Sequence, residues 1–263
     1  MRRRRKTLLN WWRYCELIAL LIRTSKINLV DYGWCPKWQL PQGVQARITT
    51  VSEPGNLATH VNDNPILVAS NRTQLAQELA LPQPPKWLAQ YHSTKVIEAQ
   101  QAKLDEPADA IWSAQPQTVC AVLTADCLPI LLCSDCGDVV AAIHAGWRGL
   151  AQGIVAETLT QLPLPANQFR AFIGPAIGPK HFEVGGDVYH AFEGLGVVDS
   201  QSFKPHIKGK WLADLPLLAE RVLQKLGIQN VTQSAICTFS DERFFSYRQD
   251  PTCGRFASLI WKN

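Results

Sequence analysis

The chain has 263 residues and a mass of 29.3 kDa, enough for one large domain or two small ones. Hydrophobic residues make up 46% of it and charged residues 18%, which excludes an intrinsically disordered or collagen-like chain. Uncharged apolar runs such as residues 17–22 are far shorter than the roughly 20 residues of a membrane-spanning helix. The composition therefore predicts a globular protein without a membrane span.

The net charge of +4 is distributed unevenly along the chain. Residues 1–26 hold eight Arg and Lys against the single acid Glu16, a net of +7, so the remainder carries −3. Because a nucleic-acid-binding surface spreads its positive charge across a folded face, this tail does not predict nucleic-acid binding. The tail could be a signal peptide, an amphipathic helix at a membrane surface or an extension outside the fold, and its apolar part is too short for the first. We expect residues 1–30 to be a basic N-terminal extension and residues 31–263 to be the domain.

Eight cysteines are sparse for a chain of this length. Several lie in apolar runs with the pattern of a strand, as Cys120 does. The Cys133-x-x-Cys136 pair has no second pair to complete a structural zinc site. We therefore expect free thiols and a cytoplasmic protein.

The predicted elements mix strands and helices without a regular βαβ alternation. A strand over residues 45–51 is followed by a long polar loop over 52–64, of the kind that often holds sites. Helices are expected over residues 71–81, 147–162, 187–192 and 211–226. Further strands are expected over residues 87–98 with a break at 92–95, and over 118–123, 128–132, 139–143, 169–173, 231–237 and 256–261. This order predicts an α+β fold with mixed or antiparallel sheets and packed helices.

The stretch that carries the clearest chemistry covers residues 123–149. Two apolar runs flank the turn CSDCGD at residues 133–138, which predicts a β-hairpin. In the simplest register Cys127 lies directly opposite His144, with Cβ atoms about 4.5–5.5 Å apart. A thiolate and an imidazole at that separation can bind one metal ion or form a Cys–His catalytic dyad. Pro129 interrupts regular pairing, and a bulge there would change this register.

The surroundings of this pair predict further site residues. His144 comes just before a predicted helix whose first turn holds Arg148, and a helix N-terminus with a guanidinium favours an anion. The third metal ligand is expected to be His92, at the strand break, with His60 in the polar loop as the second candidate. Asp126, beside Cys127, is a candidate supporting partner or acid/base, and capping of a turn is the alternative.

At these residues the sequence resembles the YfiH-like, or laccase-domain, family. The motifs that carry the resemblance are TADCLPILL (124–132), AAIHAGWRGL (141–150), IGPAIGPKHFEVGGDV (173–188) and the ending CTFSDERFFSYRQDPTCGRFASLIW, and GNLATHVNDNP (55–65) and EPADAIWS (106–113) fit as well. The resemblance runs from about residue 48 to 261 and implies a single α+β domain similar to a bacterial toxin deamidase. Ala176 departs from it, because many members have a cysteine there.

The resemblance implies a zinc site formed by His92, Cys127 and His144. Family members are described as purine nucleoside phosphorylases acting on adenosine, inosine, guanosine and methylthioadenosine, and as adenosine deaminases. Arg72 resembles an arginine proposed to contact substrate or phosphate. We expect Arg72, Arg148 and Asn56 to bind substrate or phosphate, and Cys127, His144, Asp126 and Arg72 to take part in catalysis.

Two other functions stay open at this point. Older descriptions call the family copper-dependent polyphenol oxidases, but a laccase needs roughly ten imidazoles for its copper centres, and this chain has six histidines and no His-x-His pair. A cysteine hydrolase would use Cys127 as nucleophile and His144 as base to cleave an amide of a cell-wall precursor. The expected partners are a purine nucleoside and phosphate, with the protein as a monomer or homodimer.

Overall fold

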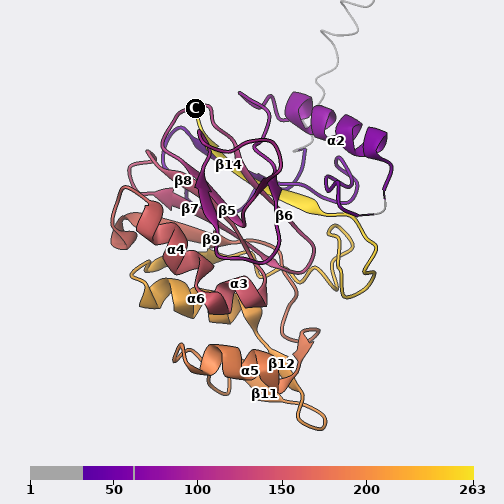
Figure 1. The fold of residues 1–263 in the computed structure, drawn as a ribbon, viewed down its shortest axis with the longest axis vertical. Helices are drawn as coiled ribbons and strands as arrows, with labels where there is room; N and C mark the ends of the chain where they lie inside the picture. The colour runs from indigo at the N-terminus through magenta and orange to yellow at the C-terminus, as the bar shows by residue number, and fades with distance from the viewer. Residues whose placement is uncertain (1–31, 62) are drawn as a thin grey trace, which may run out of the picture. The chain divides into compact units, whose positions relative to one another are not determined.

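A six-stranded mixed sheet lies at the centre of the fold (Figure 1). In order of pairing its strands are β13 (Asn230–Gln233), β9 (Phe169–Ile173), β7 (Leu128–Ser134), β8 (Val140–Ala145), β5 (Ala110–Ser113) and β3 (Val96–Glu98). The outer pairs β13–β9 and β3–β5 are parallel, and the inner pairs are antiparallel. The computed structural model describes residues 32–61 and 63–263, so the extension predicted over residues 1–30 lies outside the described residues.

A second, antiparallel sheet packs on one face of this central sheet. It consists of β1 (Val44–Ile48), β14 (Phe256–Lys262) and β6 (Cys120–Thr124). Alternate residues of β7 enter two different cores: Leu131 and Cys133 lie in the core between the sheets, and Ile130 and Leu132 lie in the core on the opposite face. Because β7 is buried on both faces, its sequence is an unbroken apolar run rather than an alternating one.

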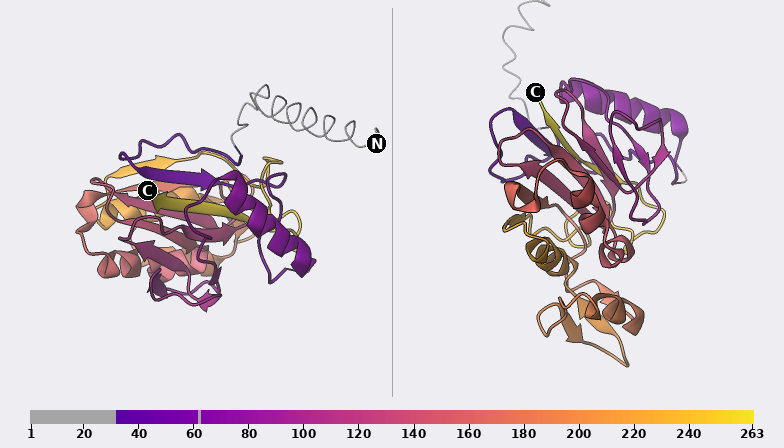
Figure 2. Two further views of the ribbon diagram at one scale, coloured as in Figure 1. Left: turned by 90° about the horizontal axis from the view of Figure 1, so that it is seen from above. Right: turned by 60° about the vertical axis from the view of Figure 1, so that its left-hand side comes forward.

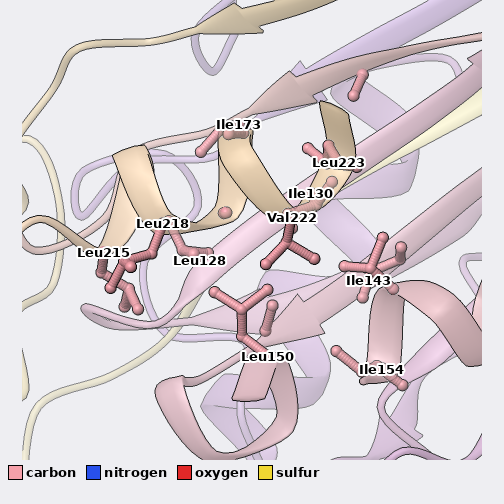
Figure 3. Close-up of a cluster of buried hydrophobic side chains, with 14 of the residues drawn as sticks. Leu128, Ile130, Ile143, Leu150, Ile154, Ile173, Leu215, Leu218, Val222 and Leu223 are labelled. Carbon is pink, nitrogen blue, oxygen red and sulfur yellow. The ribbon is translucent and has the colours of Figure 1, made fainter. Parts of the chain in front are cut away.

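Helices cover the opposite face of the central sheet (Figures 1 and 2). These are α3 (Trp147–Gln152), α4 (Ile154–Gln161) and α6 (Leu215–Lys225). Figure 3 shows Leu150, Ile154 and Val222 of these helices meeting Ile130 and Ile143 of the sheet. The sheets and packed helices confirm the predicted α+β class.

The remaining elements lie around this sandwich. They are α2 (Pro65–Glu78), the short parallel pair β2 (Leu88–Ala89) and β4 (Glu106–Pro107), the 3-10 turn Ala166–Gln168, and a small unit of β10 (Glu183–Val184), α5 (Gly186–Glu193), β11 (Phe203–Pro205) and β12 (Trp211–Ala213). The small unit lies beyond α6 at the lower end of Figure 1 and of the right-hand view of Figure 2. No helix in the described part of the chain combines the length and the apolar character needed to cross a membrane.

Three of the expected helices have different limits in the structure. The first begins at Pro65 rather than near residue 71, because the Asn64 side chain accepts a hydrogen bond from the Ile66 N–H and caps the helix. The helix expected over 147–162 is divided at Gly153, whose φ of +97° ends α3. The last begins at Leu215, capped by Asp214, because residues 211–213 form β12.

The predicted hairpin of β7 and β8 is confirmed, but its predicted register is wrong. Pro129, not Cys127, is the partner of His144. The turn is centred one residue later than expected, since the Ser134 N–H bonds to the Val139 carbonyl around Gly137, which has a φ of +80°. Moving the centre by one residue shifts the pairing by two, and a shift of two keeps every side chain on its face of the sheet. Cys127, just before β7, is therefore a diagonal neighbour of His144.

Candidate metal centre and its cavity

The side chains of His92, Cys127 and His144 converge at one edge of the central sheet. One ligand atom from each lies within 4.8 Å of the other two. Cys127 Sγ is 3.6 Å from His92 Nε2. In the described residues this is the one group of three or more Cys, His and acidic side chains placed to hold a metal ion. The structure thus brings together the three residues expected as ligands, and His60 is not among them.

Each ligand comes from a different part of the fold. Cys127 immediately precedes β7, and His144 lies near the end of β8. His92 lies between β2 and β3 with a φ of +64°, a left-handed conformation that is uncommon outside glycine. Contacts around His92 must therefore hold its backbone.

Asp109 supplies those contacts. Its fully buried carboxylate accepts hydrogen bonds from the backbone N–H groups of His92 at 3.0 Å and of Ser93 at 2.7 Å. The Ser93 hydroxyl and His144 Nδ1 also donate to it, each at 2.7 Å. Burial would raise the pKa of Asp109, but the hydrogen bonds from His144 and Ser93 lower it to about 2. One carboxylate thus orients two of the three ligands.

Asp109 was not among the site residues expected from the sequence. The sequence feature that could have indicated it is an acidic residue between two alanines, Ala108 and Ala110. It lies at the start of a buried strand and inside the motif EPADAIWS. Its role depends on the pairing of β5 with β8, in which the His144 N–H bonds to the Asp109 carbonyl at 2.7 Å.

The titration of the ligands follows from this arrangement. Burial would lower the pKa of His144, but its hydrogen bonds with Asp109 and Cys127 raise that pKa to about 9. Burial would raise the pKa of the Cys127 thiol, but hydrogen bonds with His144 and His92 lower it to about 6. Because Asp109 occupies Nδ1 of His144, Nε2 is the nitrogen left for a ligand. The lowered pKa favours the thiolate form of Cys127 at neutral pH.

Gly146 leaves room for the ligands. A Cβ atom added there would lie 2.5 Å from His92 Cδ2 and 3.1 Å from Cys127 Sγ. The chain therefore passes the ligands at a distance that only glycine permits.

These residues fit a zinc ion. Two imidazole nitrogens and a thiolate are typical zinc ligands, and three protein ligands leave one coordination position open, as in catalytic zinc sites. The absence of a side chain at Gly146 leaves space for His92 and Cys127, and Asp109 orients the His144 ring. Both features favour binding of a metal ion by these three side chains.

A cavity of about 430 Å³ opens over the three ligands, a volume suited to a small molecule. Three arginine side chains in its walls each stack on an aromatic ring. The distance from the guanidinium carbon to the ring centre is 4.3 Å for Arg148 on Trp147, 5.8 Å for Arg248 on Phe182 and 5.6 Å for Arg255 on Tyr247. None of the three guanidinium groups forms an ion pair with a carboxylate in the described residues. Flat surfaces beside unpaired positive charge favour a planar ligand and an anion.

Of the residues expected to bind substrate or phosphate, Arg148 lines this cavity, and Arg72 and Asn56 are outside its lining. Arg72 lies on α2, donates from Nε to the Leu57 carbonyl at 2.9 Å and stacks 4.6 Å from the Trp87 ring centre. Asn56 is buried and accepts a hydrogen bond from the Arg255 N–H at 2.9 Å. Both residues support the loop over residues 55–61.

Asp126 lines the cavity and also connects it to the C-terminal segment, which agrees with the expected supporting role and leaves the acid/base role a prediction. Its carboxylate accepts hydrogen bonds from the Thr238 hydroxyl at 2.6 Å, the Ser246 hydroxyl at 3.1 Å and the Arg248 N–H at 2.7 Å. These donors occupy both oxygens, and all three come from the C-terminal segment. Asp126 therefore holds that segment, including Arg248, against the start of β7.

Comparison with known proteins places this chain in a family. Residues 42–263 match the family model described as multi-copper polyphenol oxidoreductase laccase. The chain belongs to this laccase family. The predicted resemblance is also confirmed by its relatives: a Shigella flexneri protein named purine nucleoside phosphorylase YfiH is 44% identical over 236 residues, covering 86% of this chain and 97% of that protein. A Pseudomonas aeruginosa protein named purine nucleoside phosphorylase is 42% identical over 236 residues, covering 86% of this chain and 96% of that protein.

Solved structures share the fold. A crystal structure from Neisseria meningitidis superposes with a TM-score of 0.83 at 40% identity, covering 88% of this chain and 99% of that one. The YfiH protein of Bacillus licheniformis gives a TM-score of 0.76 at 26% identity, covering 84% of this chain and 93% of that one.

The copper chemistry in the family's description does not fit this laccase-family chain. Four of its six histidines are outside the triad. His181 stacks 4.3 Å from the Phe239 ring, and His190 and His206 pair with Glu193 and Glu183. A trinuclear copper cluster with a separate blue copper site needs more converging imidazoles than these.

Proposed function

We propose that this protein is a zinc-dependent purine nucleoside phosphorylase that also deaminates adenosine. The observation that carries the proposal is the open His-Cys-His triad at a cavity walled by three arginine–aromatic pairs. The names of the Shigella and Pseudomonas relatives support it. The proposed substrates are adenosine, inosine, guanosine and methylthioadenosine.

In phosphorolysis a phosphate oxygen forms a bond to the ribose C1′ while the bond from C1′ to the purine nitrogen breaks. The electron pair of that bond leaves with the base. Trp147 and Phe182 offer flat surfaces for the purine, and the unpaired guanidinium groups of the cavity bind phosphate and stabilise developing negative charge. His92, Cys127 and His144 would hold zinc, which when bound supplies Lewis-acid chemistry.

We also propose a cytoplasmic protein whose partners are small molecules. The seven cysteines among the described residues are free thiols, as in proteins of reducing compartments. A monomer or a homodimer is compatible with a cavity built from one chain.

The proposal is tested by adenosine turnover with and without phosphate, following adenine, inosine and hypoxanthine. We expect phosphate-dependent release of adenine by protein that contains about one zinc per chain. Cys127→Ala should lose both the zinc and the turnover, because it removes the thiolate ligand. The control is Cys136→Ala, which removes an exposed thiol in the hairpin turn and should retain both. Bound zinc without turnover of any purine would contradict the proposal, and inosine formation without any phosphate-dependent release of adenine or hypoxanthine would indicate a deaminase alone.

One observation favours the cysteine hydrolase as a second candidate, namely that the pKa of Cys127 is lowered to about 6. Alkylation with iodoacetamide, followed by mass spectrometry of the modified peptides, separates the two functions. If Cys127 is a zinc ligand, zinc-loaded protein should resist alkylation there. Chelator-treated protein should react at a rate that rises through about pH 6, because the lowered pKa yields the thiolate above that pH. Rapid alkylation of Cys127 in zinc-loaded, active protein would favour the hydrolase.

A further inference from the structure

We propose that His60, on the loop over residues 55–61, and Arg255, which both line the cavity, form the subsite that binds phosphate. This inference rests on the proposed function and assigns phosphate, one of the two substrates of phosphorolysis, to a part of the cavity. The alternative phosphate-binding residue is Arg148, which also lines the cavity.

His60 is the histidine that the rest of the fold leaves free. It lines the cavity together with His92 and His144 but does not belong to the metal-binding group. The other histidines have partners: His92 and His144 belong to the triad, and the remaining three stack on Phe239 or pair with Glu193 and Glu183. Within the described residues, the His60 imidazole has no hydrogen bond, ion pair or ring contact. Its donor and its acceptor are both available to a ligand.

The loop that carries His60 is built onto Arg255. The Asn56 side chain accepts hydrogen bonds from the N–H groups of Ala58 and Arg255, each at 2.9 Å. The Leu57 N–H donates to the Arg255 carbonyl at 3.2 Å, and the Asn71 side chain donates to the Asn56 carbonyl at 2.9 Å. His60 and Arg255 are thus held on one scaffold beside the same cavity.

Arg255 brings positive charge that the protein does not neutralise. One terminal nitrogen of its half-buried guanidinium donates to the carbonyls of Cys253 at 2.6 Å and Gly254 at 2.9 Å. Within the described residues, no protein acceptor forms a hydrogen bond with its Nε or with its other terminal nitrogen. A partly buried cation without a carboxylate partner favours an anionic ligand.

The charges around His60 favour its neutral imidazole. Partial burial and the positive charge of Arg255 lower the pKa of His60. The charges of His144 and Arg72 act in the same direction. A neutral imidazole donates to a phosphate oxygen or accepts from a phosphate hydroxyl, and the guanidinium supplies the opposite charge.

The test measures phosphate directly on the zinc-loaded full-length protein. Inorganic phosphate is titrated calorimetrically, and initial rates are measured while phosphate and adenosine are varied in turn. His60→Ala should raise the Kd and the KM for phosphate by about tenfold or more and change the KM for adenosine by less than about twofold. His60→Gln keeps a donor and an acceptor and should restore part of the phosphate affinity. The control His190→Gln alters an exposed histidine on α5 and should leave both constants unchanged.

The competing site is tested with Arg148→Gln. Phosphate affinity lost in Arg148→Gln but retained in His60→Ala would overturn the inference. Phosphorolysis by the wild type with an unchanged phosphate KM in His60→Ala would also overturn it and would leave the proposed function standing. Conversely, phosphate binding that depends on His60 without any phosphorolysis would support the subsite and reject the proposed function.

Discussion

Replacing Asp109 with asparagine is expected to weaken zinc binding by about 10- to 100-fold and to destabilise the metal-free protein by about 3–5 kcal/mol. The Asp109 carboxylate is fully buried and accepts from five donor groups, on Tyr91, His92, Ser93 and His144. Asparagine has one acceptor oxygen and would turn its own N–H₂ toward these donors, leaving buried groups without partners. His144 would also lose the carboxylate that fixes its ring and raises its pKa.

Zinc affinity is measured by competition with a chelator, and stability by urea unfolding of the metal-free form. The control is Asp105→Asn, an exposed aspartate four residues earlier. Its φ of +51° is one that asparagine adopts readily, so that variant should match the wild type in both measurements. Wild-type zinc affinity in Asp109→Asn would show that the carboxylate does not orient the ligands.

The sequence identified the three candidate metal ligands that the structure brings together, although the predicted hairpin register was wrong. The predicted pairing is shifted by two residues, and such a shift leaves Cys127 and His144 on the same face of the sheet. Their predicted proximity is therefore correct. An error of one residue would have placed them on opposite faces. The register depends on the left-handed conformation of Gly137, which moves the centre of the turn. The expected register assumed instead that the turn is centred on the middle of residues 133–138.

Residues whose role depends on contacts between distant parts of the chain could not be predicted from the sequence. Asp109 meets His144 only because β5 pairs with β8, and Arg248 reaches the cavity through Asp126, more than 100 positions away. The motif that ends the chain was recognised, but not which of its arginines enter the cavity. Arg72 and Asn56 form hydrogen bonds that support the loop carrying His60, and their expected role in binding substrate or phosphate stays a prediction.

Replacing Gly146 with alanine is expected to lower zinc affinity by about 100-fold or more and to abolish turnover, with a loss of stability of only about 1–3 kcal/mol. The added Cβ would lie 2.5 Å from His92 Cδ2, closer than a Cβ approaches another heavy atom in a real protein, so the His92 ring must move. Cys127 Sγ is only 3.1 Å from the same point, which leaves the ring little room beside the thiolate. The φ of −62° at Gly146 suits any residue, so the effect is steric and falls on the ligands rather than on the backbone.

The matched control is Gly194→Ala, a glycine at the end of α5 with a φ of −65° and no heavy atom within 4 Å of the added Cβ. It should bind zinc and turn over substrate as the wild type does. Zinc content and thermal unfolding, measured on both variants, separate loss of the ligand cradle from loss of the fold. If Gly146→Ala bound zinc as tightly as the wild type, His92 would not be a ligand, because the alanine displaces that ring before any other ligand. Folded protein that has lost zinc would instead establish that this close passage of the chain is required to hold His92 beside Cys127.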